Sequence, residues 1–252
     1  MGDITTTSSQ SNEFVDKIAR LSRSETYLDF CQEAYGYRLP LFNMMDREQF
    51  DFLFSEMKCS DADVILDLGC GSGSVLRYVT EKFGCKGVGI DLLSRELLPP
   101  DSETIHYISG DIDCFSELFV KPSITLCIDS LYFSNDLGKL LSQIHSLQYN
   151  RAFLFYSQYI FEENPADRTI LQADHTVLAG ILRQQNIPYR AVDFSGNERA
   201  LYPAALSALE KRKDEFRLEG NADLYGKILR DNLLGKQLYD TGRASRYLYI
   251  LA

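Results

Sequence analysis

The stretch VILDLGCGSGSV, at residues 64–75, constrains the fold of this chain more than any other segment. It joins an apolar run, interrupted by Asp67, to three alternating glycines, Gly69, Gly71 and Gly73. The apolar run has the length of a buried strand, and the residues after the glycines have helical spacing. Glycines between a strand and a helix let the backbone approach a ligand closely. The stretch therefore predicts a strand–loop–helix unit with a ligand at the carboxyl end of the strand.

Further short apolar runs follow this unit, and stretches with helical spacing separate most of them. Such an alternation predicts right-handed crossovers and a mostly parallel sheet that helices cover on both faces. We therefore expect an α/β, Rossmann-like fold with seven strands, at residues 64–68, 87–91, 105–109, 124–129, 152–157, 189–194 and 246–251.

The segments outside this alternation suggest how the chain is organised. Residues 1–12 are rich in Ser and Thr and are expected to form a disordered tail, and residues 13–252 a single domain. Apolar residues at helical spacing predict a helical cap over 13–60. Residues 196–244 read as two or three amphipathic helices inserted before the last strand, where they can cover a cleft as a lid.

Composition excludes several classes of partner. Acids outnumber bases by 36 to 26 in the 252 residues, and the net charge of −10 disfavours nucleic acid, whose phosphates require a basic face. No apolar run is long enough to span a membrane, and the N-terminal residues do not resemble a signal peptide. The six cysteines form no CxxC pair, which indicates free thiols in a reducing cytoplasm and no metal site. The sequence does not indicate an oligomeric state.

Carboxylates recur at the ends of the first four predicted strands, as Asp67, Asp91, Asp111 and Asp129. In an open α/β sheet these ends share one edge, where ligands bind. A carboxylate after the second strand can accept hydrogen bonds from both ribose hydroxyls. Asp111 can accept one from an adenine amino group, beside the backbone N–H of Ile112. Four such acids beside one glycine loop predict a nucleotide-type cofactor site.

The spacing of the glycines distinguishes between two kinds of nucleotide cofactor. A dinucleotide fingerprint requires G-x-G-x-x-G, but the third position is Ser74 when counted from Gly69 and Leu76 when counted from Gly71. Asp67, just before the loop, suits a positively charged ligand better than a pyrophosphate. An NAD-dependent oxidoreductase is therefore the less favoured alternative.

With these motifs the chain resembles a class I S-adenosylmethionine-dependent methyltransferase. The resemblance covers Asp63 to Ser157 by motif and extends less specifically to the C-terminal end. It implies that the last strand, RYLYIL at 246–251, runs antiparallel to the others. The helical cap and the late helical insertion are most similar to the small-molecule branch, and in layout to the phosphoethanolamine, glycine and sarcosine N-methyltransferases.

The resemblance also implies roles for individual residues. The glycine loop would lie against the methionine part of S-adenosyl-L-methionine, with Asp67 organising the loop and the amino group of the cofactor. Further residues would hold the ribose, the adenine and the sulfonium end, and tyrosines of the cap, Tyr37 among them, would close over the methionine carboxylate. The implied cofactor site consists of Asp67, Gly69, Cys70, Gly71, Gly73, Asp91, Leu92, Asp111, Ile112, Asp129, Ser130, Tyr27 and Tyr35.

The activated methyl group of such a cofactor requires mainly that the acceptor is well positioned, although a hydroxyl acceptor also requires a general base. We expect Tyr132 and Asp129 to contact the substrate, and His175 is the best-placed histidine to act as a base. Clustered Tyr and Phe residues could hold either a cationic amine or a flat apolar metabolite. A cofactor-binding protein with non-methylating chemistry, or with a regulatory role, is the alternative to a small-molecule methyltransferase.

Overall fold

The sheet has seven strands in the order β3-β2-β1-β4-β5-β7-β6. The computed structural model of the protein describes residues 8–117, 121–147 and 151–251. All neighbouring pairs up to β5 are parallel, whereas β7 runs antiparallel to both β5 and β6. The strands are β1 (Val64–Leu68), β2 (Lys86–Asp91), β3 (Ile105–Ser109), β4 (Ile124–Ile128), β5 (Arg151–Tyr159), β6 (Arg190–Asp193) and β7 (Ala244–Leu251). The predicted fold, including the antiparallel last strand, is confirmed.

Helices fill most of the segments between and around the strands, although residues 92–104 between β2 and β3 form none. Three short 3-10 helices also lie in the loops, at η1 (Ile112–Glu117), η2 (Leu131–Phe133) and η3 (Thr169–Leu171). The α-helices are α1 (Ser8–Leu21), α2 (Glu25–Tyr35), α3 (Arg47–Met57), α4 (Ser74–Phe83), α5 (Leu137–Ser146), α6 (Val177–Gln184), α7 (Ser195–Leu218) and α8 (Ala222–Asp240).

Several boundaries differ from those that the sequence predicts. Helix α1 begins at Ser8, inside the 1–12 segment that was expected to be a tail, because no Pro or Gly interrupts the helical pattern there; residues 1–7 lie outside the described part of the chain. Strand β4 ends at Ile128, since Asp129 has a φ of +55° and leaves the extended conformation. Strands β5 and β7 are longer than predicted because they pair with each other from Ala152 to Tyr159.

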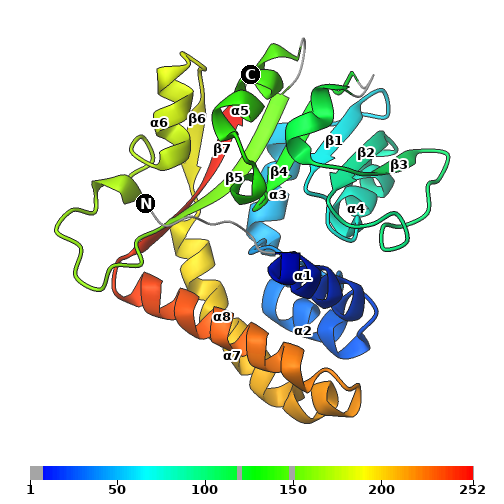
Figure 1. The fold of residues 1–252 in the computed structure, drawn as a ribbon, viewed down its shortest axis with the longest axis vertical. Coiled ribbons are helices and arrows are strands. Elements are labelled where there is room, and N and C mark those ends of the chain that lie inside the picture. The colour runs from blue at the N-terminus through cyan, green and yellow to red at the C-terminus, as the bar shows by residue number, and fades with distance from the viewer. Residues whose placement is uncertain (1–7, 118–120, 148–150, 252) are drawn as a thin grey trace.

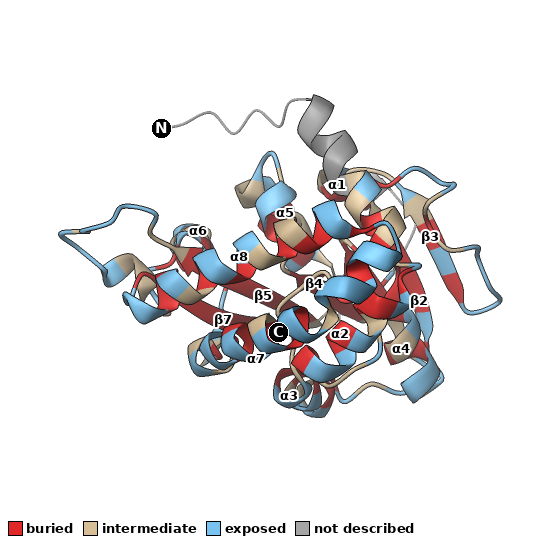
Figure 2. Ribbon diagram, turned by 90° about the horizontal axis from the view of Figure 1, so that it is seen from below, coloured by how far each residue is buried: buried red, intermediate tan, exposed pale blue. Residues whose placement is uncertain are grey.

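Two apolar clusters, one on each face, hold the sheet between layers of helices. One joins residues of the strands to α2, α3, α4, α7 and α8, and the other joins them to α5 and α6. Figure 2 shows the buried residues concentrated in the central strands and on the inward sides of the helices. Both faces of the sheet are therefore covered, as its continuous apolar strands require.

Helices α1, α2, α7 and α8 gather at one end of the sheet, below it in Figure 1, where the parallel strands end. Helix α7 packs against both α8 and α2. Helices α7 and α8 of the late insertion and helices α1 and α2 of the N-terminal cap thus form one helical layer over the carboxyl edge of the sheet. Within the described residues, no helix is long and apolar enough to cross a membrane.

The close approach of α7 and α8 depends on one glycine. A Cβ atom at Gly235 in α8 would lie 2.2 Å from the ring of Tyr202 in α7, which is buried. We expect Gly235→Ala to lower the free energy of unfolding by about 1–3 kcal/mol, because the clash outweighs the better helix propensity of alanine. Urea unfolding measures this difference.

The matched control is Gly226→Ala in the same helix. The nearest atom to a Cβ there is the flexible Nη1 of Arg230, at 3.5 Å. This variant should be as stable as the parent, or more stable by up to about 1 kcal/mol. If the two alanine variants were equally stable, the packing argument for Gly235 would be wrong.

Candidate functional site

The glycine loop is fixed by close packing and by hydrogen bonds to β2. The backbone N–H groups of Gly69 and Cys70 donate to the carbonyl oxygen of Ile90, at 2.8 and 3.0 Å. Gly69 has a φ of +81°, and a Cβ there would lie 2.3 Å from the Cβ of Ser130. Gly73 has a φ of +69° and would meet the ring of Tyr107 at 2.4 Å. Both positions therefore require glycine, for conformation as well as for space.

Asp91, at the end of β2, is tied to the glycine loop. Its carboxylate accepts hydrogen bonds from the backbone N–H of Gly71, at 2.8 Å, and from that of Leu93, at 3.1 Å. Burial raises the pKa of Asp91, and these backbone donors oppose the rise. The next side chain, Leu92, is 63% exposed. A carboxylate and an apolar side chain thus stand together beside the loop, open to a ligand.

Asp67 is buried beneath the loop in β1, with 3% of its surface exposed. Burial raises its pKa to about 7, and the nearby charge of Asp91 adds to the rise. Two carboxylates that disfavour each other's ionisation form a site that a bound cation stabilises. This feature fits a ligand with a positively charged end.

Asp111 and Ile112 begin the segment after β3. Asp111 accepts hydrogen bonds from the backbone N–H of Asp113, at 2.9 Å, and from Nδ2 of Asn135, at 3.2 Å, and Ile112 is buried. These contacts hold the turn at the edge of the sheet. The predicted role of the pair in holding adenine stays a prediction.

The segment between α2 and α3, residues 40–44, crosses the carboxyl edge of the sheet. The carbonyl oxygen of Pro40 accepts a hydrogen bond from Ser74, and the backbone N–H of Met44 donates to Asp129 at 3.1 Å. The ring of Phe42 lies 3.9 Å from the place of a Cβ at Gly71 and stacks on Tyr27. The cap therefore touches the glycine loop through Phe42, a residue that the sequence analysis did not select.

Asp129 forms an ion pair that the sequence did not reveal. Its two oxygens accept hydrogen bonds from Nη1 and Nη2 of Arg246 in β7, at 2.7 and 2.9 Å. Arg246 is fully buried, and its remaining donors reach Gln49 and Ser157. The neighbouring Ser130 donates to the carbonyl oxygen of Leu68 at 2.5 Å. Asp129 is thus held in place by a bidentate charge-assisted contact.

A second buried carboxylate completes this network. Glu198 in α7 is fully buried and lies 3.5 Å from Nη1 of Arg246. It accepts hydrogen bonds from four hydroxyl groups at 2.6 to 3.0 Å, those of Ser157, Tyr159, Tyr202 and Tyr239. Nothing in the local sequence around Glu198 indicates this role, because all of these partners except Tyr202 come from other elements, β5, α8 and β7.

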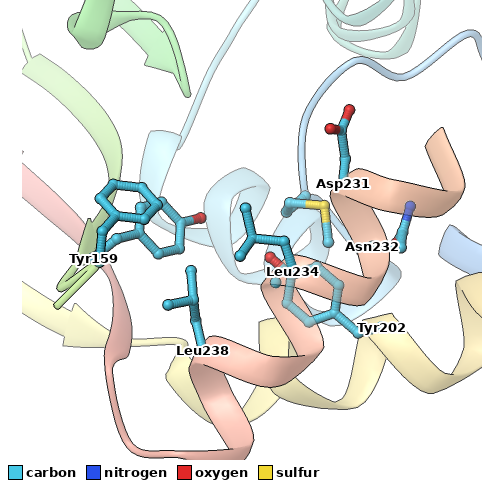
Figure 3. Close-up of a pocket in the computed structure, with 9 residues that line it drawn as sticks. Tyr159, Tyr202, Asp231, Asn232, Leu234 and Leu238 are labelled. Carbon is cyan, nitrogen blue, oxygen red and sulfur yellow. The ribbon is translucent and has the colours of Figure 1, made fainter. Parts of the chain in front are cut away.

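Two adjoining cavities lie between this network and the helical layer. One, of about 210 Å³, is lined by Lys17, Tyr27, Tyr35, Leu41, Phe42, Asn43, Met44, Asp129, Tyr132, Tyr159, Ile228, Asp231, Asn232 and Arg246. The other, of about 240 Å³ and shown in Figure 3, is lined by Met44, Tyr159, Phe161, Tyr202, Asp231, Asn232, Leu234, Gly235 and Leu238. They share four lining residues and therefore lie side by side between the strand ends and α8.

Three of the predicted tyrosines lie in the wall of the first cavity. Tyr27, Tyr35 and Tyr132 line the first cavity together with Asp129. The hydroxyl of Tyr132 is occupied, since it donates to the carbonyl oxygen of Ser157 and accepts from the N–H of the same residue. Burial raises the pKa of Tyr132 well above its usual value, so it is poorly suited to act as a base.

Two residues lie apart from the cavities. His175 is exposed in the loop before α6 and lines neither of them. Its position after β5 suggested the cleft edge, but β5 continues to Tyr159 and the loop that follows leads away from the helical layer (Figure 1). Tyr37 packs edge-on against Phe50 and Tyr78 instead of lining a cavity.

Comparison with known proteins gives matches among solved structures. Phosphoethanolamine N-methyltransferase 2 from Haemonchus contortus, in complex with phosphomonomethylethanolamine and S-adenosylhomocysteine, is 13% identical with a TM-score of 0.71, covering 95% of this chain and 60% of that one. The cyclopropane synthase MmaA2 from Mycobacterium tuberculosis is 12% identical with a TM-score of 0.69, covering 94% and 98%. No protein-family model and no curated protein matches the sequence.

A S-adenosylmethionine-dependent methyltransferase from Geobacter sulfurreducens, in complex with S-adenosylhomocysteine, is 14% identical with a TM-score of 0.58, covering 88% of this chain and 97% of that one. The chain spans 60% of the length of the Haemonchus enzyme. At these identities the matches establish the fold alone, which this chain shares with the matched enzymes.

The raised pKa of Asp67 makes the stability of the ligand-free protein depend on pH. The folded-state pKa of about 7 lies above that of an unfolded aspartate, so the folded state holds the proton more tightly. The resulting stability is present at low pH and is lost as the pH rises through 7. We expect Asp67→Asn, which cannot ionise, to exceed the parent in free energy of unfolding by up to about 4 kcal/mol at about pH 8.5.

At about pH 5 the difference between this variant and the parent should fall to about 1–2 kcal/mol, because folded Asp67 then holds its proton whereas the unfolded aspartate is already mostly ionised. Urea unfolding at both pH values measures it, with Asp61→Asn as the control for the loss of an exposed carboxyl. An equal gain at both pH values would contradict a buried ionising carboxyl.

Proposed function

We propose that this protein binds S-adenosylmethionine at the carboxyl edge of its sheet and transfers the methyl group to a small-molecule acceptor. The observation that carries the proposal is the paired environment of Asp67 and Asp91 beside a loop that only glycine can form. One carboxyl, with a pKa raised to about 7, lies beneath the loop, and the other accepts the N–H of Gly71. The fold supports the same ligand, since matched structures are in complex with S-adenosylmethionine or S-adenosylhomocysteine.

The residues around the loop fit the parts of this cofactor. Asp91 accepts two backbone donors and has lone pairs left for both ribose hydroxyls. Asp67 and the loop face the positively charged methionine end, with Cys70 and the cap residues Tyr27 and Tyr35 nearby. Asp111 and Ile112 would hold the adenine, and the exposed Leu92 would cover it. When bound, the cofactor supplies an electrophilic methyl group on a sulfonium centre.

The side chains of the protein position the acceptor more than they act as acids or bases. Asp129 and Ser130 stand where β4 ends, and Arg246 and the backbone of Met44 hold the carboxylate of Asp129 from two sides. Tyr132 forms part of the cavity wall with its hydroxyl bonded to the backbone. These groups orient an acceptor and keep water out, and the rate then comes from alignment.

Two alternatives remain as outcomes of the tests. Non-methylating chemistry with the same cofactor, or a regulatory role, has some support because a matched structure is a cyclopropane synthase. An NAD-dependent oxidoreductase is disfavoured because Ser74 stands where a dinucleotide fingerprint has glycine, and its buried hydroxyl is bonded to Pro40. Incubation with labelled S-adenosylmethionine and a panel of small metabolites separates methyl transfer from the first alternative.

Cofactor binding provides the direct test. Isothermal titration calorimetry with S-adenosylhomocysteine should show binding to the parent, and no heat with NAD. Asp91→Asn replaces a charged acceptor by an amide, and we expect the affinity for S-adenosylhomocysteine to fall about 10- to 100-fold, as for hydrogen bonds to a charged group. Asp61→Asn, at an exposed site away from the loop, should bind as the parent does. An unchanged affinity in Asp91→Asn would exclude the proposed ribose contact.

A further inference from the structure

The cavity wall beside Glu198 presents hydrogen-bond acceptors. Tyr159 and Tyr202 line the cavity of Figure 3, and their hydroxyls donate to Glu198 at 2.9 and 2.6 Å. Each hydroxyl has one proton, which it donates to Glu198 in a hydrogen bond. Only the lone pairs of the two phenol oxygens therefore remain for a ligand. Because Glu198 binds both phenol protons, Tyr159 and Tyr202 can only accept hydrogen bonds from a ligand in the cavity.

Asn232 adds a buried acceptor to the same wall. The residue lies in α8, lines both cavities and is 5% exposed. Its Nδ2 donates to the carbonyl oxygen of Ile228 at 2.8 Å, and its Oδ1 has no hydrogen-bond partner among the described residues. A buried acceptor without a partner carries a free-energy cost, which a ligand with an N–H donor removes.

The charges around the cavities favour a cation. Two carboxylates, Asp129 and Glu198, surround the single guanidinium of Arg246, so the network has a net negative charge. Arg246 donates from Nε, Nη1 and Nη2 to protein acceptors. At the rim, the charge of Lys17 is compensated by Asp231, at 3.4 Å. An anionic ligand would find neither a free cation nor a row of donors among these residues.

From this wall we infer that the two cavities form a binding site for an organic ammonium ion, a primary or secondary amine that bears an apolar substituent. The N–H groups would meet the oxygens of Tyr159, Tyr202 and Asn232. The substituent would lie against the aromatic and aliphatic side chains that make up the rest of the lining, among them Leu234 and Leu238. Aromatic faces also attract a cation directly.

The identity of this amine as the methyl acceptor rests on the proposed function, whereas its binding does not. Methyl transfer to it would form one C–N bond, break the C–S bond with its electron pair left on sulfur, and release one N–H proton. Once the amine is deprotonated, no base other than solvent is needed. This agrees with the state of the two carboxylates, since Asp129 is paired with Arg246 and Glu198 accepts hydrogen bonds from hydroxyl groups.

The test uses three probes of similar shape and different charge, benzylamine, benzyl alcohol and benzoate. Isothermal titration calorimetry of the full chain near neutral pH, with and without S-adenosylhomocysteine, should show that benzylamine binds at least about tenfold more tightly than the other two, the difference expected for a charged hydrogen bond. Equal or tighter binding of the alcohol or of benzoate overturns the inference. Failure of S-adenosylhomocysteine to bind overturns the proposed function alone, since the amine is titrated separately.

Two variants separate ligand contact from support of the wall. Tyr159→Phe and Tyr239→Phe each remove one hydrogen bond to Glu198, but only Tyr159 lines the cavities. We expect Tyr159→Phe to weaken benzylamine binding about tenfold, and Tyr239→Phe to change it less than about twofold, with unchanged affinity for S-adenosylhomocysteine in both. Equal weakening in the two variants, or none in Tyr159→Phe, contradicts the inference. Asn232→Leu should also weaken binding and serves as the second cavity variant.

Discussion

One buried guanidinium connects the parts of this structure that lie far apart in the sequence. Arg246 in β7 is fully buried, lies 5.2 Å over the ring of Phe155, and bonds to Asp129, which is 117 residues earlier. Removal of such a charge from water costs several kcal/mol unless good partners surround it. Here a bidentate carboxylate, a second carboxylate and an amide oxygen from Gln49 provide them. The end of β4, the helix α7 and the helix α3 are therefore held against the last strand.

The same contact reaches the glycine loop. Asp129 has a left-handed backbone, which is unfavourable for a residue with a side chain and persists only where the surroundings fix it. Arg246 and the N–H of Met44 fix it from two sides. The next residue, Ser130, then lies so close to Gly69 that no Cβ fits between them. A charge in β7 thus helps to shape the loop at the end of β1.

The sheet was predictable because its signals are local. The strands are short apolar runs, most of the crossovers have helical spacing, and the loop at Gly69 to Gly73 carries the glycines that its backbone conformation requires. The acids at strand ends could be placed on one edge for the same reason. Their partners could not, because Arg246 meets Asp129 and Glu198 only through the tertiary fold. His175 lies in the exposed loop before α6 and lines neither of the two cavities, so its role as a base stays a prediction.

The two halves of the site come from different parts of the chain, one from the strands and one from the helices inserted before β7. The glycine loop, Asp67 and Asp91 belong to the strands and their ends, and local backbone geometry holds them in place. They therefore determine which ligand can lie against the backbone of the loop. Glu198 and Asn232 belong to the helices inserted before β7. Glu198 accepts the phenol proton of Tyr159, and Asn232, whose Nδ2 donates to Ile228, presents its Oδ1 as an acceptor. A change of Glu198 to an apolar residue would free the phenol protons for a ligand, and it would also remove a partner of Arg246. The inserted helices thus determine the hydrogen-bond polarity of the cavity wall, whereas the strands determine the conformation of the glycine loop.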